Sequence, residues 1–470
     1  MELDRLSCDR ARRSRDARFD GRFFVAVTST GIYCRPICPA RSPKDENVRY
    51  FLSAAAAEAA GFRPCLRCRP EAAPGSPAWN GTSGVVSHAL RLISEGALDG
   101  EGVERLAERV GVSGRHLRRL FRQHLGATPL EVALTRRVHF AKKLLDETGL
   151  GLEEIAYASG FGSLRRFNAR IRRTFRRTPT ELRRRARNRA ACEPECYRFR
   201  LAYRAPYDWE GMLRYLDSRA IEGVESVDGS TYRRTIAVEG KSGVIEVSLL
   251  PASSALSLSV RFPDPRALLL IVERVRRIFD VGADPSVVAE HLGLDLRLRA
   301  LLAKSPGVRI PGAWDGFELA AAAVLGRRIA RRLAEELGTP LPVGRGLERL
   351  FPEPHVVARA SLERAGAPPA RAAILRCLAR EMASGRDLLS SAAAVPGFPG
   401  RTAEYLRMRA LGEPDAFPSL DPAVRRSSET WHPWRAYAYM LLRTERTGSW
   451  RRNAQVDGAD LAAVPVYGAR

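Results

Sequence analysis

The sequence lacks any long apolar run, and no stretch approaches the ~18 consecutive apolar residues that a membrane helix needs. Its first residues, Met1 to Arg5, also lack the apolar core of a secretory signal peptide. Acidic residues are scarce, with 53 against 77 lysines and arginines, which leaves a formal net charge of +24. Such a basic chain is expected to bind a polyanion, and nucleic acid fits better than a membrane surface. We therefore expect a cytoplasmic protein that contacts no membrane.

Cysteine is also scarce, and four of the eight cysteines fall into two closely spaced pairs. Cys34 and Cys38 are separated by three residues, and Cys65 and Cys68 by two. Four thiolates in two short-spaced pairs are typical of a tetrahedral zinc site, because each pair chelates from one tight turn. The pairing argues against a disulfide framework and agrees with a reducing compartment. The sequence therefore predicts zinc as a cofactor.

Two roles are open for this zinc module, which also contains a predicted helix over Ser53–Ala60. Zinc could act only as a structural staple. The alternative is chemical, because arginines that flank the cysteines would keep a thiolate ionised and attract a phosphate. These arginines are Arg35, Arg41, Arg63, Arg67 and Arg69.

The segments Phe23–Pro36 and Gly61–Cys68 closely resemble the N-terminal domain of Ada-type DNA-repair proteins. The resemblance implies that Cys34 is both a zinc ligand and the acceptor of a methyl group from DNA methylphosphotriesters. It covers a module of residues 1–75, and a linker follows.

An internal repeat comes next, in which Leu106–Pro129 recurs as Ile155–Pro179. Each copy predicts a helix, a tight turn at a glycine, and a second helix whose apolar residues recur every four positions. This is the pattern of a helix-turn-helix. Ser113 and Ser163 are the expected N-caps of the two second helices, and a long helix is predicted over Pro129–Glu147 between the copies.

The two copies resemble the AraC-type DNA-binding domain over residues 85–187, which implies binding to double-stranded DNA and makes RNA polymerase a candidate partner. From Leu164 to Arg189 there are twelve arginines against one acid, Glu181. Such a run can be a solvated face or a disordered tail, but here an apolar stripe interrupts it, which indicates a folded helix with a cationic open face. The positions expected to approach the DNA grooves are Arg115, Arg118, Arg119, Arg165, Arg166 and Asn168.

Beyond a linker with Cys192 and Cys196, the apolar period changes to two. These cysteines have the spacing of half a metal site, but no second pair is available, so we interpret them as incidental. Alternating apolar residues predict strands over residues 199–203, 245–249 and 256–262. Helices are predicted over Trp209–Ser218 and Pro265–Phe279.

These elements form a small α+β layer over residues 197–283. Its segments Ala205–Trp209, Arg219–Glu225 and Leu268–Asp280 resemble the N-terminal domain of AlkA-type 3-methyladenine DNA glycosylases.

Residues 284–450 predict an all-α domain, and residues 451–470 a C-terminal tail. The informative segment is Val395–Tyr405, a Pro-Gly hairpin between two helices, whose backbone amides can hold one DNA phosphate. With the carboxylate that follows it, the segment resembles the helix-hairpin-helix glycosylase domain. The implied site residues are the catalytic Asp421, the base-pocket residue Tyr405, and the DNA-binding Gly397 and Gly400.

Several positions depart from the glycosylase pattern. Pro399 replaces a hairpin glycine, Arg327–Ala330 stands where a Gln-rich wedge is expected, and Arg443 replaces an aromatic residue. Arg401 stands in place of the lysine of bifunctional members, so a hydrolase without lyase chemistry is expected. The chain also lacks the Pro-Cys-His-Arg motif of the O6-alkylguanine methyltransferase that usually follows in Ada proteins.

The sequence therefore predicts a multidomain, mainly helical protein with α+β parts that responds to alkylation damage. Methyl transfer to Cys34 is expected to switch on sequence-specific DNA binding, and the C-terminal half to excise alkylated purines such as 3-methyladenine by hydrolysis. The alternatives are a methylation-sensing regulator whose glycosylase domain is inactive, and a regulator in which the zinc is structural and Cys34 is inert.

Overall fold

The computed structural model describes residues 4–74, 84–185, 195–419 and 422–447, which fold into two compact units. Within these residues no helix combines the length and hydropathy that a bilayer span requires. The boundaries of the four predicted domains stay predictions. The first unit contains Met1–Ala205, Leu249–Arg276 and Val281–Ser286, and the second contains Pro206–Ser248, Arg277–Asp280 and Val287–Arg470.

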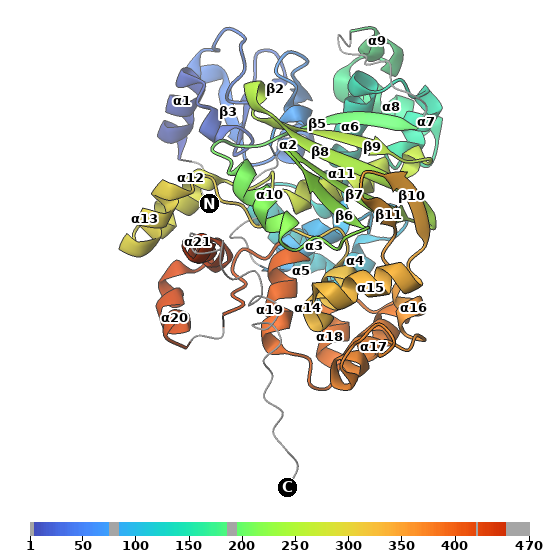
Figure 1. The fold of residues 1–470 in the computed structure, drawn as a ribbon. Coiled ribbons are helices and arrows are strands. Elements are labelled where there is room, and N and C mark those ends of the chain that lie inside the picture. Colours follow the sequence, from blue (N-terminus) through green and yellow to red (C-terminus); the bar gives the residue numbers. More distant parts are fainter. Residues whose placement is uncertain (1–3, 75–83, 186–194, 420–421, 448–470) are drawn as a thin grey trace. The chain divides into compact units, whose positions relative to one another are not determined.

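The N-terminal part of the first unit, drawn in blue in Figure 1, contains a small four-stranded sheet in the order β3-β1-β2-β4. β1 pairs antiparallel with β2 and β3, whereas β2 and β4 are parallel. Helix α2 begins after Ser53, whose side chain accepts a hydrogen bond from the Ala56 N–H, and this confirms the predicted helix. The elements are α1 (Arg5–Ser14), β1 (Phe24–Val27), β2 (Ile32–Cys34), β3 (Val48–Phe51), α2 (Ala54–Ala59) and β4 (Arg63–Pro64), with 3-10 turns at Ala17–Phe19, Asp45–Asn47 and Pro70–Ala72.

The helix-turn-helix prediction is confirmed in both copies. The hydroxyls of Ser113 and Ser163 accept hydrogen bonds from backbone N–H groups in the first turns of α5 and α8. Helix α6 has the predicted bounds and begins with a capping box between Thr128 and Glu131. The helices are α3 (Gly84–Ser94), α4 (Val103–Arg109), α5 (Gly114–Leu125), α6 (Pro129–Glu147), α7 (Leu152–Ala158), α8 (Leu164–Phe175) and α9 (Pro179–Arg184).

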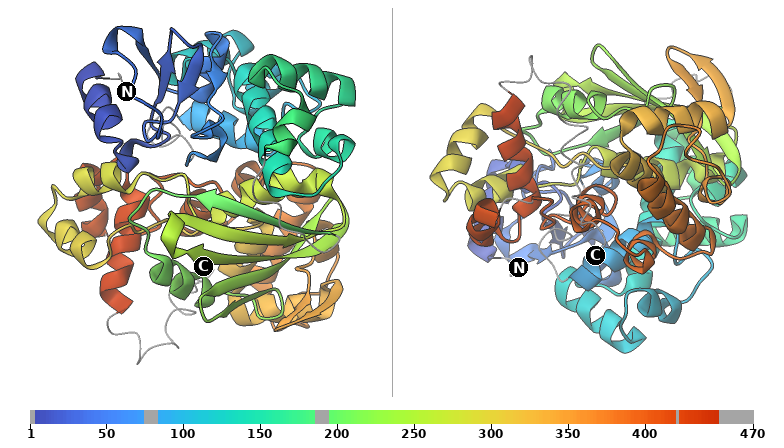
Figure 2. Two further views of the ribbon diagram at one scale, coloured as in Figure 1. Left: turned by 90° about the horizontal axis from the view of Figure 1, so that it is seen from above. Right: turned by 60° about the horizontal axis from the view of Figure 1, so that its bottom comes forward.

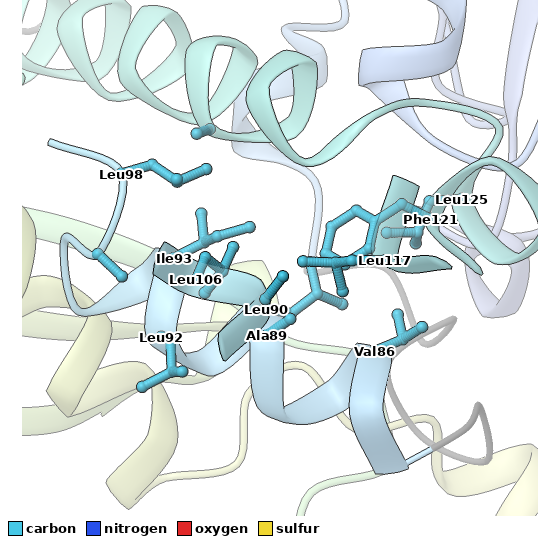
Figure 3. Packing of buried hydrophobic residues seen from close by; sticks show 13 residues of the cluster. Val86, Ala89, Leu90, Leu92, Ile93, Leu98, Leu106, Leu117, Phe121 and Leu125 are labelled. Atoms are coloured by element: carbon cyan, nitrogen blue, oxygen red, sulfur yellow. The ribbon is translucent and has the colours of Figure 1, made fainter. Parts of the chain in front are cut away.

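A buried apolar cluster holds α5 in place (Figure 3). Leu90 and Ile93 of α3 pack with Leu106 of α4 and with Leu117 and Phe121 of α5, and none is more than 3% exposed. Burying one such side chain contributes roughly 1.5–3 kcal/mol. Because each helix offers one apolar stripe to this cluster, its polar residues must face outward.

The strands predicted from period-two patterns are present. β5 (Cys196–Ala202) and β9 (Ala255–Arg261) pair antiparallel in the first unit. β6 (Glu225–Asp228) and β7 (Thr231–Val238) of the second unit form an antiparallel meander with β8 (Lys241–Leu250), most of which lies in the same unit. These strands are drawn in green in Figure 2.

The sequence did not predict β6 and β7, because charged residues hide the alternation in β7. Arg234 is 1% exposed and forms ion pairs of 2.7 Å with both Glu225 and Glu318. A buried arginine between two carboxylates therefore occupies a core position that the pattern reads as polar.

The C-terminal half is helical as expected, with one difference. A two-stranded ribbon, β10 (Pro340–Gly344) and β11 (Leu347–Arg349), interrupts the segment predicted as all-α. Its proline and glycine content and its short strands are typical of a loop, which is why the pattern gave no strand signal. The remaining helices are α10 (Trp209–Asp217), α11 (Leu268–Ile278), α12 (Pro285–Leu292), α13 (Leu296–Lys304), α14 (Gly316–Leu325), α15 (Arg327–Leu337), α16 (Pro354–Val357), α17 (Pro369–Ala383), α18 (Leu388–Ala394), α19 (Gly400–Arg409), α20 (Pro422–Ser427) and α21 (Arg435–Thr447).

Candidate functional site

The two cysteine pairs meet at one end of the small sheet. β2 ends at Cys34 and β4 ends directly before Cys65, and because these strands are parallel, both deliver their cysteines to the same end. In a tetrahedral zinc–thiolate site the sulfurs are roughly 3.8 Å apart, so the donor set fits a metal ion. The sulfur atoms that all lie within 4.8 Å of one another belong to Cys34, Cys38, Cys65 and Cys68.

The four thiols share protons unequally. The hydrogen bond with Cys34 lowers the pKa of the Cys38 thiol to about 7, and it is also the largest cause that lowers the pKa of the Cys65 thiol. The thiolate, and not the thiol, is the metal ligand. Hydrogen bonding with Cys38 raises the pKa of the Cys34 thiol, so a bound divalent cation would have to displace the proton that this sulfur keeps.

Backbone hydrogen bonds distinguish the four sulfurs. The Arg35 N–H donates to Cys68 Sγ at 3.4 Å, and the N–H groups of Ala40 and Cys68 stabilise the thiolates of Cys38 and Cys65. In the described part of the chain no backbone N–H donates to Cys34 Sγ. A thiolate stabilised by an N–H donor is a weaker nucleophile. Cys34 is also half-buried, whereas Cys65 and Cys68 are buried, so it is the sulfur best placed to react.

The flanking arginines divide into two groups. Arg35 Nε donates to Asp20 Oδ1 at 2.8 Å, and Arg69 Nη2 lies 2.6 Å from Asp146 Oδ2, so these two arginines are held by buried carboxylates. Their ion pairs fix the loops beside the cysteines, although the Arg69 side chain stays partly exposed. The arginines that form no ion pair with any described residue, and so supply the open positive charge, are Arg41, Arg63 and Arg67.

The predicted DNA-binding residues lie on the second helix of each helix-turn-helix. Except for Arg118, these residues are exposed, and they lie on the helix face opposite the buried apolar stripe. Arg118 is half-buried and lies 2.5 Å from a carboxylate oxygen of Glu104. We call α5 and α8 the recognition helices; α5 carries Arg115, Arg118 and Arg119, and α8 carries Arg165, Arg166 and Asn168.

The predicted hairpin of the second unit joins α18 to α19. Gly397 has φ +72°, a left-handed conformation that favours glycine, and Gly400 opens α19, whose first turn has no side-chain cap. Both glycines are exposed. Pro399 is the N-cap residue at φ −66°, so this departure from the family pattern is compatible with the turn. Asp421 lies outside the described residues.

Tyr405 is buried in a cluster that sequence reasoning did not predict. Arg409 Nη1 donates to Tyr405 Oη at 2.9 Å, and Tyr215 Oη lies 3.3 Å from the same oxygen. Burial by itself would raise the pKa of Tyr405, but the positive charges of Arg409 and Arg219 lower it to about 7. Burial raises the pKa of the neighbouring Tyr215. The i, i+4 spacing of Tyr405 and Arg409 on one helix is the signal that could have revealed the pair.

Two of the family departures also have defined contacts. Arg443 Nη1 donates to Tyr439 Oη at 3.1 Å, and its guanidinium lies 5.9 Å from the centre of the Tyr215 ring. Arg401 Nε donates to the Pro418 carbonyl at 3.1 Å. The arginine that replaces an aromatic residue therefore still packs among aromatic rings.

Comparison with known families matches three parts of the chain. The metal-binding domain of Ada matches residues 7–71, a helix-turn-helix domain matches residues 106–185, and the AlkA N-terminal domain matches residues 198–315. These are the three kinds of domain that the sequence motifs indicated.

Individual relatives agree. The Escherichia coli "DNA-3-methyladenine glycosylase 2" is 31% identical and covers 54% of this chain and 98% of its own length. The Escherichia coli "Bifunctional transcriptional activator/DNA repair enzyme Ada" is 44% identical over 25% of this chain and 31% of its own. A solved 3-methyladenine DNA glycosylase from Archaeoglobus fulgidus is 16% identical, covers 52% of this chain and 96% of its own, and has a TM-score of 0.45, which is too low to bear on the assignment.

The match to one relative extends over almost the whole chain. The Mycobacterium tuberculosis protein "Probable bifunctional transcriptional activator/DNA repair enzyme AlkA" is 40% identical and covers 94% of this chain and 97% of its own. With the clustered cysteines, the paired recognition helices and the glycosylase segments in one polypeptide, the chain belongs to the family of bifunctional transcriptional activators and DNA-repair enzymes that join Ada-type and AlkA-type domains.

Proposed function

We propose that Cys34 accepts the methyl group of DNA methylphosphotriesters and that the AlkA-type half hydrolyses the N-glycosidic bond of alkylated purines such as 3-methyladenine. The observation that carries the first activity is the contrast among the four sulfurs. Cys34 is partly exposed and its sulfur accepts no backbone N–H from the described residues, whereas each of the other three has such a donor.

Zinc, when bound, would keep all four sulfurs ionised at neutral pH. Cys34 Sγ then attacks the methyl carbon of the triester. The new S–C bond forms while the methyl–oxygen bond breaks, and the electron pair stays on the phosphate oxygen. The products are a methyl thioether and an ordinary phosphodiester anion. Because a thioether does not readily release its methyl group, we expect one transfer per molecule.

The transfer also removes one negative charge from the cysteine cluster. A thiolate cluster repels DNA phosphates, so its partial neutralisation should strengthen binding by the recognition helices. We expect the methylated protein to bind its promoter at least ~10-fold tighter, a coupling of about 1.4 kcal/mol. As an activator in the cytoplasm, it would present the bound promoter to RNA polymerase.

In the glycosylase half, we assign Asp421 the role of a fixed carboxylate. Rupture of the glycosidic bond builds positive charge on the sugar, which a carboxylate stabilises while it orients water. The base must first leave the stack, with Gly397 and Gly400 binding a backbone phosphate and Tyr405 beside the base. Arg401 offers no amine for a Schiff base and is hydrogen-bonded to the Pro418 carbonyl, which supports a monofunctional hydrolase.

The first test compares full-length wild type with Cys34→Ser and with the control Cys377→Ser, whose cysteine lies outside the cluster. Each protein is incubated with DNA that carries methylphosphotriesters, and intact mass, metal content and DNA affinity are measured. We expect about one zinc per wild-type chain and one added methyl in wild type and control. Methyl uptake by Cys34→Ser would overturn the assignment.

The second test measures base release from alkylated DNA by wild type and Asp421→Asn. The carboxylate acts on charge that exists mainly in the transition state, so its loss should abolish release and leave DNA affinity nearly unchanged. If wild type releases no base either, the glycosylase domain is an inactive DNA-binding appendage.

A further inference from the structure

The Ada-type module contacts both recognition helices through α2. Ser53 Oγ, at the start of α2, donates to the carbonyl of Leu125 at the end of α5, at 2.7 Å. Ala56 in the same helix is 6% exposed. A Cβ atom added at Gly126, the residue after α5, would lie 3.0 Å from the Cβ of Ala56. The first turn of α2 is therefore packed closely on the C-terminal end of the first recognition helix.

The other end of α2 carries a buried carboxylate. The Glu58 side chain is 8% exposed and accepts hydrogen bonds from Tyr33 Oη and Thr135 Oγ1, each at 3.0 Å. His139 Nε2 lies 3.1 Å from the same carboxylate, and Arg170 Nη2 lies 3.9 Å from it. Thr135 and His139 belong to α6, and Arg170 belongs to α8. The Glu58 carboxylate of the module therefore contacts both α6 and the second recognition helix, α8.

The network begins beside the reactive cysteine. Tyr33 is fully buried, precedes Cys34 in β2, and has its hydroxyl 3.0 Å from His139 Nε2. On the other side of the cysteine cluster, Arg69 follows Cys68 and is ion-paired with Asp146 of α6. Both cysteine pairs are thus tied to α6 by residues adjacent to them in the sequence.

We infer that the α2 face of the Ada-type module is an intramolecular docking surface for α5, α6 and α8, and that Glu58 is its positioning residue. The inference rests on the proposed methyl switch and deepens it. A docked module carries the thiolate cluster along whenever the recognition helices bind DNA. The unmethylated cluster then opposes binding, and methylation at Cys34 relieves the opposition.

A module that is released from this surface can move its charge away from DNA. Release should therefore raise the DNA affinity of the unmethylated protein. It should also lower the gain in DNA affinity on methylation, because the module and the recognition helices then contact DNA independently of each other. A purely structural role of the interface predicts lower affinity in both states instead.

The docking surface can be broken by Ala56→Glu in the full-length chain. Ala56 is the third residue after the N-cap Ser53, so glutamate there completes a capping box and should preserve α2, while its bulk cannot fit against Gly126. The matched control is Ala60→Glu, which adds the same charge at the exposed C-cap residue of the same helix.

Affinity is measured by fluorescence anisotropy at one salt concentration, on a duplex selected from random sequence by the methylated wild-type chain. For Ala56→Glu we expect normal metal content and methyl uptake, about 3-fold tighter binding before methylation, and a methylation gain below about 3-fold instead of ~10-fold. Ala60→Glu should behave as wild type.

A second variant approaches the interface from the other side. Thr135→Val keeps the shape of the side chain on α6 but removes the hydroxyl that donates a hydrogen bond to Glu58. It should change the DNA affinity before methylation and the methylation gain in the same directions as Ala56→Glu, by a smaller factor. If the wild type takes up no methyl group, the proposed function fails. If the wild type is methylated and tightens while both variants show the same gain as wild type, the docking inference is overturned.

Discussion

The buried Tyr405 and Arg409 pair should make the stability of the second unit depend on pH. The pKa of Tyr405 is about 7 in the folded chain, against an ordinary value near 10. Between these values the unfolded chain binds more protons than the folded chain, so the free energy of unfolding should rise with pH. Integrated from pH 7 to pH 9, the shift amounts to about 2 kcal/mol of added stability.

Urea unfolding at fixed pH values from 6 to 9 can measure this slope. Tryptophan fluorescence reports mainly on the second unit, because five of the six tryptophans belong to it. Tyr405→Phe should remove the rise. A suitable control is Tyr197→Phe in the first unit, where burial raises the pKa to about 12, outside the range of the experiment.

Ultraviolet absorbance gives an independent readout. Wild type should gain a tyrosinate band as pH passes 7, and Tyr405→Phe should lack it. Arg409→Met should move the band to higher pH, because the guanidinium that stabilises the phenolate is gone. Equal pH slopes in wild type and Tyr405→Phe would refute the reasoning.

Two further predictions concern charged residues. Replacing Arg165 and Arg166 by alanine should weaken duplex binding and reduce the slope of log affinity against log salt by about 2, measured by titration at several salt concentrations. The same change at Arg187 and Arg189, outside the described residues, should have a smaller effect. An equal effect would contradict the role of α8. Arg234→Met should lower the free energy of unfolding of the second unit by about 3–5 kcal/mol in urea, because the carboxylates of Glu225 and Glu318 stay buried without their partner. A loss below about 1 kcal/mol would show that water reaches these carboxylates.

Local patterns account for the parts of the fold that the sequence predicted. The spacing of the cysteines, the serine caps of α5 and α8, and the bounds of α6 depend on residues within a few positions of one another. Such short-range chemistry repeats in many proteins and can be recognised from one sequence.

The rest depends on pairing between distant residues. Tyr33 and His139 are 106 positions apart, and neither the hydroxyl nor the imidazole indicates its partner in the sequence. β7 was missed for a similar reason, since Arg234 is acceptable in a core only because Glu318 reaches it. A buried polar residue looks exposed in sequence until its counterion is known.

The parallel pairing of β2 with β4 orders events during synthesis. A ribosome releases Cys34 and Cys38 first, but β4 can return beside β2 only after β3 and α2 have been made. Until then the emerging chain has half of the donor set, which holds a metal ion weakly, and capture becomes tight when Cys65 and Cys68 arrive. Tight metal binding thus requires the complete module, and a nascent chain that ends before β4 lacks Cys65 and Cys68 and cannot form the four-cysteine site.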